Sequence, residues 1–207
     1  MQIYLAFDMD YPEDYEVIYP IFEAIQDTPV VLFIVGSRHP KEPIPLHSYV
    51  ELGNHSFDHK EWYDETLEDI IKDMEKNHEF IKNLYGVEPK VYRSPHLRYI
   101  KEVDQEMQLR GYLPEMKCAE CPHCLPITEN LRTYFSSHHH FFNGFRPCGR
   151  DFLEMFQTLC EKGEDFTFFL DPHDFVEEER LTTLKHLIKI GNDFGKFSVL
   201  SKNKKGL

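Results

Sequence analysis

Residues 2–10, QIYLAFDMD, place a short apolar run directly before two acidic residues. A second run, VVLFIV at residues 30–35, is rich in β-branched and aromatic side chains. Continuous apolar runs of this length are typical of strands that are buried on both faces of a parallel sheet. The intervening residues 13–26 carry apolar side chains at helical spacing, namely Val17, Ile18, Ile21, Phe22 and Ile25. The sequence therefore predicts a strand, a helix and a second strand parallel to the first.

The same alternation continues to the end of the chain. We expect further strands at residues 49–52, 90–93, 112–116, 131–135, 166–170 and 197–200, and helices at 64–85, 103–110, 151–160 and 177–190. Alternating strands and helices indicate βαβ units and a parallel sheet. About seven units favour an α/β fold of the distorted (β/α) barrel type over an open doubly wound sheet. No linker divides the chain, so we expect residues 1–207 to form one domain, with a cysteine-rich loop at 117–126.

The composition argues against several classes of partner. The chain has 36 acidic and 23 basic residues and a net charge of -13. This charge opposes binding to nucleic acid, which depends on basic contacts with phosphates, and to an anionic membrane surface. No apolar run approaches the roughly 20 residues of a membrane helix, and no secretory signal pattern is visible, so we expect a cytoplasmic protein. The oligomeric state cannot be predicted from the sequence.

Polar clusters follow four of the predicted strands. They are Asp8 with Asp10, His55 with His59, Arg93–His96, and Asp171–Asp174. In parallel α/β folds, active sites gather at the carboxyl ends of the strands. The four clusters are therefore expected to meet at one edge of the sheet.

The first two clusters predict a metal site. Unpaired buried carboxylates such as Asp8 and Asp10 are costly, and a metal ion or a basic partner would compensate for them; an exposed acidic turn is the alternative. His55 and His59 have the i,i+4 spacing that puts two imidazoles on one face of a helical turn. With 12 histidines in the chain, chance alone predicts about 0.7 such pairs. The prediction of a metal site therefore depends mainly on the position of this pair directly after a strand. Two histidines and one carboxylate leave coordination positions open, as a catalytic zinc or iron site requires.

The other two clusters offer groups for catalysis. Arg93 at a strand end could hold a catalytic carboxylate through a bidentate pair, and a surface arginine beside a turn is the alternative. His173 has carboxylate neighbours and could donate a proton near neutral pH. The alternative is a solvent-facing His173 next to a helix-capping Asp174.

In this order, the clusters resemble the motifs of the polysaccharide deacetylase family, which includes chitin and peptidoglycan deacetylases. Phe7-Asp8-Met9-Asp10 resembles the first motif in its F-D-x-D variant. His55-Ser56-x-x-His59, preceded by Gly53-Asn54, is similar to the second motif, and Arg93-x-Pro95 resembles the third. The segment 171–175 stands where the fifth motif belongs. The resemblance spans residues 2–175.

The resemblance implies a distorted (β/α) barrel and a hydrolase that removes an acetyl group from an N-acetylated carbohydrate. One divalent metal ion, commonly zinc in the family, would be bound by Asp10, His55 and His59. Asp8 would be the general base, and Arg93 would orient it. The backbone N–H of His96 would stabilise the oxyanion, and a histidine would protonate the leaving amine.

Two departures from the family pattern concern this proton donor. Variant members often have His-Pro-x-acidic in the fifth motif, which would put Asp171 at the histidine position. We predict His173 instead, because an aspartate needs a strongly raised pKa to donate a proton at pH 7. No clear fourth motif is present. The histidines at 138–140 lie in that gap as another candidate acid, although an exposed polar run is the simpler interpretation.

The cysteine-rich loop is not part of the family pattern. Five cysteines cannot all pair with one another, so reduced thiols or a metal site are expected. Cys118, Cys121 and Cys124 have a spacing that would suit a second, structural zinc. The candidates for a fourth ligand are His123, Cys148 and Cys160.

Two other functions remain open alongside deacetylation of a carbohydrate. The same metal site could hydrolyse a C–N bond in a small molecule that is not a sugar, such as a cyclic ureide. Alternatively, the altered fifth motif could mark a carbohydrate-binding protein that has lost catalysis.

Overall fold

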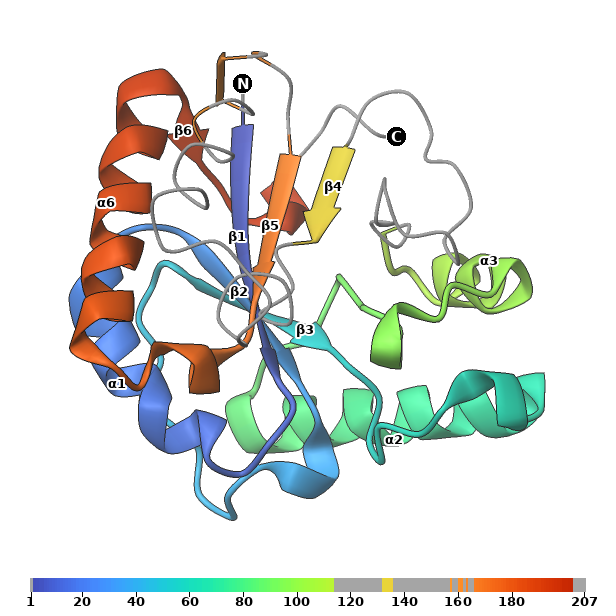
Figure 1. The fold of residues 1–207 in the computed structure, drawn as a ribbon. Coiled ribbons are helices and arrows are strands. Elements are labelled where there is room, and N and C mark those ends of the chain that lie inside the picture. The colour runs from blue at the N-terminus through green and yellow to red at the C-terminus, as the bar shows by residue number, and fades with distance from the viewer. Residues whose placement is uncertain are drawn as a thin grey trace.

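A parallel sheet forms the centre of the computed structural model, which describes residues 2–113, 132–135, 157, 160–161, 163 and 166–202 (Figure 1). Its strands are β1 (Gln2–Met9), β2 (Val30–Ile34), β3 (Val50–Asn54), β4 (Arg132–Phe135), β5 (Phe166–Leu170) and β6 (Lys196–Phe197). They follow the order β3-β2-β1-β5-β4, and β6 pairs with the start of β1. All of these pairs are parallel, which confirms the predicted α/β class.

The strand order is compatible with a (β/α) barrel. Beyond β3, an isolated parallel bridge between Asn54 and Tyr92 adds the next position in the sequence. On the other side of β1 come β5 and then β4, so the first strand lies between β2 and a strand from the end of the chain.

Helices cover the sheet on both sides of this row (Figure 1). They are α1 (Asp14–Ile25), α2 (Leu67–Tyr85), α3 (Lys101–Leu109) and α6 (Glu178–Phe194). The helices α1 and α6 lie together on one side, and α2 and α3 lie on the other. None of the helices in the described part of the chain is long and apolar enough to cross a membrane.

The strand β1 is buried on both faces, as its unbroken apolar run predicts. Ile3, Leu5 and Phe7 belong to the cluster that α1 and α6 cover, whereas Tyr4 and Ala6 pack with side chains of β2 on the opposite face. Because both faces are buried, apolar and polar residues do not alternate along the strand, and polar residues begin only at its carboxyl end. The fold therefore delivers Asp8 and Asp10 to the rim of the core.

The helix α2 shows how local sequence signals set the boundaries. Thr66 caps its first turn by accepting a hydrogen bond from the N–H of Asp69 at 3.2 Å. The helix begins at Leu67 rather than at residue 64, because residues 62–64 form a separate 3-10 turn. Gly86 ends it with a left-handed φ of 70°, as expected for a glycine at this position.

Several predicted elements differ in the structure. The strand expected at 90–93 is reduced to the bridge at Tyr92, and Tyr112 and Leu113 lie outside any strand. The last strand ends at Phe197, and a 3-10 turn at residues 200–202 follows it. Most of the helix expected at 151–160 and the whole cysteine-rich loop at 117–126 lie outside the described residues.

Candidate active site

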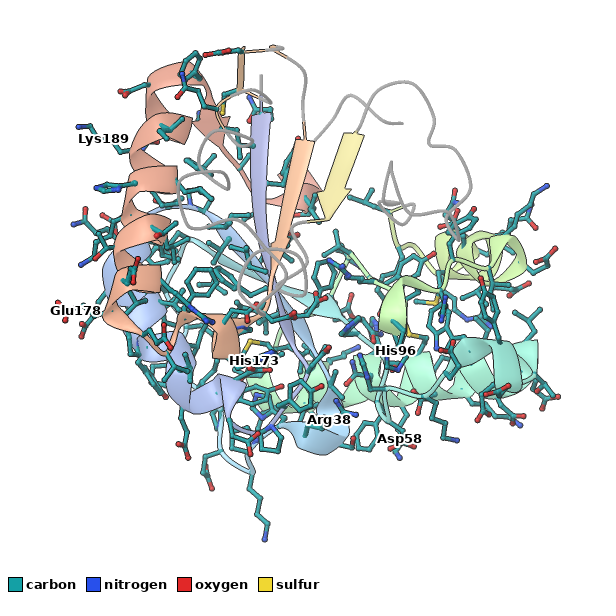
Figure 2. All side chains as sticks on the ribbon, viewed as in Figure 1. Arg38, Asp58, His96, His173, Glu178 and Lys189 are labelled. Carbon is teal, nitrogen blue, oxygen red and sulfur yellow. The ribbon has the colours of Figure 1, made fainter. Side chains whose placement is uncertain are left out.

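The carboxyl ends of β1, β2 and β3 bring the predicted polar clusters together. Asp8 is in register with Phe33 of β2, and the next pair along β2 joins Ile34 to Asn54, the residue before His55. In Figure 2, the labelled His96 and His173 lie at this lower end of the sheet, opposite the N-terminus. The four clusters, distant in sequence, therefore share one edge as predicted.

Asp10, His55 and His59 form a compact set of candidate metal ligands. The Oδ1 atom of Asp10 lies 3.3 Å from Nε2 of His55 and 3.1 Å from Nε2 of His59. Nitrogen and oxygen ligands stand about 2.0–2.1 Å from zinc, so two of them at a tetrahedral centre are roughly 3.3 Å apart. The observed separations match this value.

Unsatisfied polar atoms at the same place also fit a cation. Oδ1 of Asp8 and Nδ1 of His59 are buried and make no hydrogen bond with any described residue, and the neighbours of Asp10 Oδ1 are the two histidine nitrogens. Buried polar atoms are almost always paired, so a buried carboxylate oxygen without a donor, beside two imidazole nitrogens and a second carboxylate, fits a positively charged ligand. The chemistry of the three ligands and their spacing both fit a divalent metal ion.

The loop that carries both histidines is not helical, so the predicted helical turn is wrong. Ser56 and His59 have left-handed φ angles of 63° and 53°, which turn the chain back toward β1. The carboxylate of Asp73 on α2 accepts the N–H groups of Phe57 and Asp58 at 2.9 and 3.2 Å. Strained backbone of this kind persists only where surrounding contacts fix it, and it clusters at functional sites.

A buried amide network holds the start of this loop. Asn54 donates to the hydroxyl of Tyr112 at 2.9 Å and to the carbonyl of Met74 at 2.8 Å. Its Oδ1 accepts from Asn77 at 2.8 Å and from the N–H of Ser56 at 3.0 Å. All the hydrogen-bonding capacity of this side chain is used, which locks the residue before His55 in place.

Arg93 contacts two of the other predicted groups. Its Nε lies 3.2 Å from Oδ2 of Asp8, and both residues are buried. Its carbonyl accepts a hydrogen bond from Nδ1 of His55 at 2.9 Å. Because Nδ1 carries a proton in this bond, Nε2 is the atom of His55 that faces Asp10, which is the arrangement that a metal ligand needs.

Burial and charge set the protonation of these groups. Burial raises the pKa of Asp8 to about 6, although the Arg93 guanidinium opposes the rise. Burial lowers the pKa of His59 to about 4, so this imidazole is neutral at pH 7. Burial also disfavours ionised Asp10, but contacts with the two histidines overcome it and hold the pKa of Asp10 well below its usual range.

His55 behaves differently from His59. Burial disfavours its charged form, yet the carboxylates of Asp8 and Asp10 raise its pKa above the ordinary value. The two carboxylates therefore stabilise a positive charge at Nε2 of His55. A metal ion in place of the proton would meet the same favourable field.

His173 is positioned by a residue that the sequence did not single out. Asp14, at the start of α1, accepts hydrogen bonds from the main-chain N–H and from Nδ1 of His173, both at 3.0 Å. Asp14 is fully buried and Asp8 is buried too, which argues against the exposed acidic turn considered for Asp8 and Asp10. The hydrogen bond to Asp14 raises the pKa of His173. The only sequence signal was an acidic residue in the first turn of a helix that begins beside the rim.

The remaining predicted residues are placed as follows. His96 has a left-handed φ of 53°, and its ring lies edge-on to that of His59 at 4.6 Å. Asp171 is buried at the end of β5 and, through its charge, contributes to the raised pKa of Asp8. Cys160 is buried in the main core, where burial raises the pKa of its thiol to about 12. The other candidate ligands and acids, namely Cys118, Cys121, His123, Cys124, His138–His140 and Cys148, lie outside the described residues.

A family model described as polysaccharide deacetylase matches residues 1–114, more than half of the chain. The chain belongs to the polysaccharide deacetylase family. The matched segment contains the first three clusters, from Asp8 to His96. No curated protein sequence matches the chain.

Solved structures of other members of this class share the fold at low sequence identity. A putative polysaccharide deacetylase from Mycobacterium smegmatis is 14% identical, with a TM-score of 0.70 over 97% of this chain and 87% of its own. A family 4 carbohydrate esterase from Streptomyces lividans, in complex with acetate, is 12% identical, with a TM-score of 0.66 over 99% and 95%. A family 4 acetyl xylan esterase from Clostridium thermocellum, in complex with a cobalt ion, is 13% identical, with a TM-score of 0.64 over 98% and 89%.

Proposed function

We propose that this chain is a metal-dependent hydrolase that removes an acetyl group from an N-acetylated carbohydrate. The observation that carries the proposal is the convergence of Asp10, His55 and His59 beside the buried Asp8–Arg93 pair. A ligand set with open positions next to a carboxylate of raised pKa is what amide hydrolysis by water requires. Family membership supports the same chemistry.

The metal would be held by Asp10, His55 and His59, with zinc as the expected ion. When bound, it would polarise the acetyl carbonyl and make a water molecule more acidic. Asp8 is the base that accepts a proton from the attacking water. A pKa near the working pH suits a group that must accept a proton and later release it.

Other residues of the site orient the base and the metal ligands, stabilise the oxyanion and protonate the leaving amine. Arg93 keeps Asp8 in one orientation and, through its carbonyl, fixes the ring of His55. The N–H of His96 is the donor for the oxyanion of the tetrahedral intermediate. His173 donates the proton that the departing amine takes up, and its hydrogen bond to Asp14 raises the pKa of this imidazole.

Acetate release from N-acetylglucosamine oligomers, in the presence of zinc or cobalt, tests the proposal. We expect turnover by the wild type, and a fall of about 10²–10⁴-fold in Asp8→Asn, the range of a lost general base. Asp193→Asn on the exposed face of α6 is the matched control and is expected to keep full activity. Equal rates for the wild type and Asp8→Asn would reject the mechanism.

The substrate panel must separate related chemistries. Acetylated xylan tests ester hydrolysis, because the solved structures that share this fold include an acetyl xylan esterase. A set of non-sugar amides and ureides tests the broader C–N activity. Turnover of the non-sugar set with inert sugars would replace the proposed substrate. Binding of N-acetylglucosamine oligomers without hydrolysis of any substrate would identify a protein that has lost catalysis.

A further inference from the structure

A short 3-10 helix, Gly36–Arg38, follows the carboxyl end of β2 and places one cation at the rim of the site. The N–H of Ser37 donates to the carbonyl of Phe57 at 2.9 Å, which ties this turn to the histidine loop. Gly36 packs so closely that a Cβ there would lie 2.5 Å from Asn77 and 2.6 Å from the ring of Phe57. The backbone that presents Arg38 is therefore fixed by the same elements that fix the metal ligands.

The side chain of Arg38 is held on the neighbouring loop after β1. Its guanidinium donates to the main-chain carbonyl of Asp10, the candidate metal ligand. It also lies over the ring of Tyr11, 5.6 Å from the ring centroid. Tyr11 is 51% exposed, and its ring makes an edge-on contact with that of His173, with the ring centroids 5.1 Å apart. Arg38 and Tyr11 thus line the rim between the metal ligands and His173, and Figure 2 shows Arg38 and His173 at this same end of the sheet.

The charge of Arg38 is not matched by a carboxylate in the described part of the chain. The other arginines whose side chains are described each contact one: Arg93 contacts Asp8, Arg98 contacts Glu61, Arg110 contacts Glu75 and Arg180 contacts Glu177. In a chain of net charge -13, acidic partners are plentiful. An arginine that is anchored by a carbonyl and an aromatic face, yet contacts none of the described acids, keeps donors available for an external anion.

The chemistry of this group defines the ligand. A guanidinium presents five N–H donors in a planar fork that matches the oxygens of a carboxylate or a phosphate. An aromatic ring such as that of Tyr11 offers a face on which a sugar ring or a cation can lie. Arg38 donates to the carbonyl of Asp10, which is itself a candidate metal ligand. An anion bound by Arg38 would therefore lie beside the predicted metal site.

We propose that Arg38 and Tyr11 form a subsite for an anionic group, a carboxylate or a phosphate, that the carbohydrate substrate carries close to its acetylated position. The inference rests on the proposed function, because it specifies the substrate of the same site. It assigns a specificity role to Arg38, not a role in proton transfer. An anion at this place would be held by charge-assisted hydrogen bonds, and a neutral analogue would leave them unmade.

Binding measured by calorimetry tests this without turnover. Two matched pairs are titrated into the full-length, zinc-loaded Asp8→Asn protein: N-acetylglucosamine against its 6-phosphate, and N-acetylglucosamine disaccharides with a neutral or a glucuronate neighbour. We expect at least one anionic member to bind about 10-fold or more tightly than its neutral partner, the effect of a hydrogen bond to a charged group. The pair that shows this preference tells phosphate from carboxylate. Metal-free wild type serves as a second background if Asp8→Asn is poorly folded.

Variants locate the preference. Arg38→Gln is expected to bring the ratio of the two dissociation constants close to one, and Arg38→Lys to retain part of it. Arg98→Gln is the matched control, because Arg98 also lies over a tyrosine ring but contacts Glu61, and its ratio is expected to stay unchanged. Equal binding of both members of each pair, a preference that survives Arg38→Gln, or no binding at all would each overturn the subsite.

The outcome separates this inference from the proposed function. A clear preference that depends on Arg38, in a protein that releases acetate from none of these sugars, would leave the subsite standing and reject deacetylation. Acetate release from neutral and anionic sugars at equal efficiency, together with equal binding, would support deacetylation and reject the anionic subsite.

Discussion

Asp14 accepts two hydrogen bonds from His173, one from the backbone N–H and one from ring Nδ1, each at 3.0 Å. A carboxylate can only accept, so Nδ1 carries a proton and Nε2 is the atom from which a proton can leave. The second carboxylate oxygen of Asp14 accepts the N–H of Tyr11 at 2.8 Å. The start of α1 and the end of β5 are therefore joined through one buried carboxylate, which orients the imidazole and raises its pKa.

Asp14→Asn is expected to move the alkaline limb of the pH–rate profile to lower pH. The pKa of His173 is raised mainly by Asp14, with smaller contributions from Asp171 and Asp10. An acid must be protonated, so activity is lost as the pH rises through this pKa. Without the Asp14 charge the pKa falls, and the loss begins at lower pH. Acetate release, measured as kcat across about pH 5 to 9, records the limb.

The control for this change is Asp193→Asn, which removes an exposed carboxylate from α6. It is expected to leave the limb in place. If Asp14→Asn lowers kcat equally at every pH and leaves the limb where it was, Asp14 has a structural role only. His173→Ala should then be compared, since a lost general acid lowers kcat by about 10²–10⁴-fold.

Metal content tests the ligand set directly. We expect one equivalent of zinc per chain at the site, and its loss in His55→Ala, because Asp10 and His59 alone hold an ion too weakly. Chelation is expected to lower the Tm of the wild type, since an ion that binds only the folded state stabilises it by about 2.7 kcal/mol at 100 times its dissociation constant. The Tm of His55→Ala should respond less to the chelator than that of the wild type. His186→Ala, on the exposed face of α6, is the matched control.

The same measurement bears on the cysteine-rich loop. A second equivalent that remains in His55→Ala and disappears in Cys121→Ser would be the structural zinc predicted there. A wild type that binds no ion, or a His55→Ala protein that keeps the full content, would contradict the proposed catalytic centre.

Gly36→Ala is expected to destabilise the fold by about 1–3 kcal/mol, the usual cost of an added methyl group in a packed site. The new Cβ would overlap Oδ1 of Asn77 and the ring of Phe57. Asn77 in turn donates to the carbonyl of Ile34 at 2.7 Å, so the end of β2 would shift with it. Urea unfolding of Gly36→Ala against Ser37→Ala, an exposed neighbour, measures the effect. An equal midpoint for the two variants would show that the turn adapts freely.

The parallel α/β class could be predicted because apolar runs and helical spacing are local patterns, which can be recognised within a short segment of sequence. Residues 2–9 and 30–34 form strands because both faces of β1 and β2 are covered, which an unbroken apolar run requires. The positions of Asp8, Asp10, His55 and His59 followed from one rule, that parallel strands end at the same edge. The prediction of a metal centre at this edge rested on the order of the clusters rather than on any single motif.

The sequence could not predict the contacts that hold the site. Asp14 and Asp73 were indistinguishable from the other acidic residues of helices, because their role depends on a partner far along the chain: His173 for Asp14, and the N–H of Phe57 for Asp73. The i,i+4 spacing of the histidines suggested a helical turn, but left-handed residues produce the same approach of the rings. Spacing constrains which side chains meet, and tertiary hydrogen bonds decide the backbone that brings them together.

The buried pair of Asp8 and Arg93 offers the sharpest energetic test, in metal-free protein. Arg93→Gln leaves the Asp8 carboxylate buried without its cation, which typically destabilises a protein by about 3–5 kcal/mol. In the double variant with Asp8→Asn no unpaired charge remains, so part of this loss should be recovered. Urea unfolding of the wild type, the two single variants and the double variant is expected to give a coupling of at least about 1 kcal/mol at pH 7.

The coupling should depend on pH in one direction. Burial raises the pKa of Asp8 to about 6 in the folded protein, against 3.8 for the free side chain, so folding favours protonated Asp8. Its cost to stability grows as the pH rises through this window, and it grows further when Arg93 is absent. Near about pH 4 the folded protein carries Asp8 uncharged with or without Arg93, so the coupling should vanish there. A coupling of the same size at both pH values would mean that Arg93 stabilises the fold by packing and by the hydrogen bond of its carbonyl to His55, not by holding the charge of Asp8.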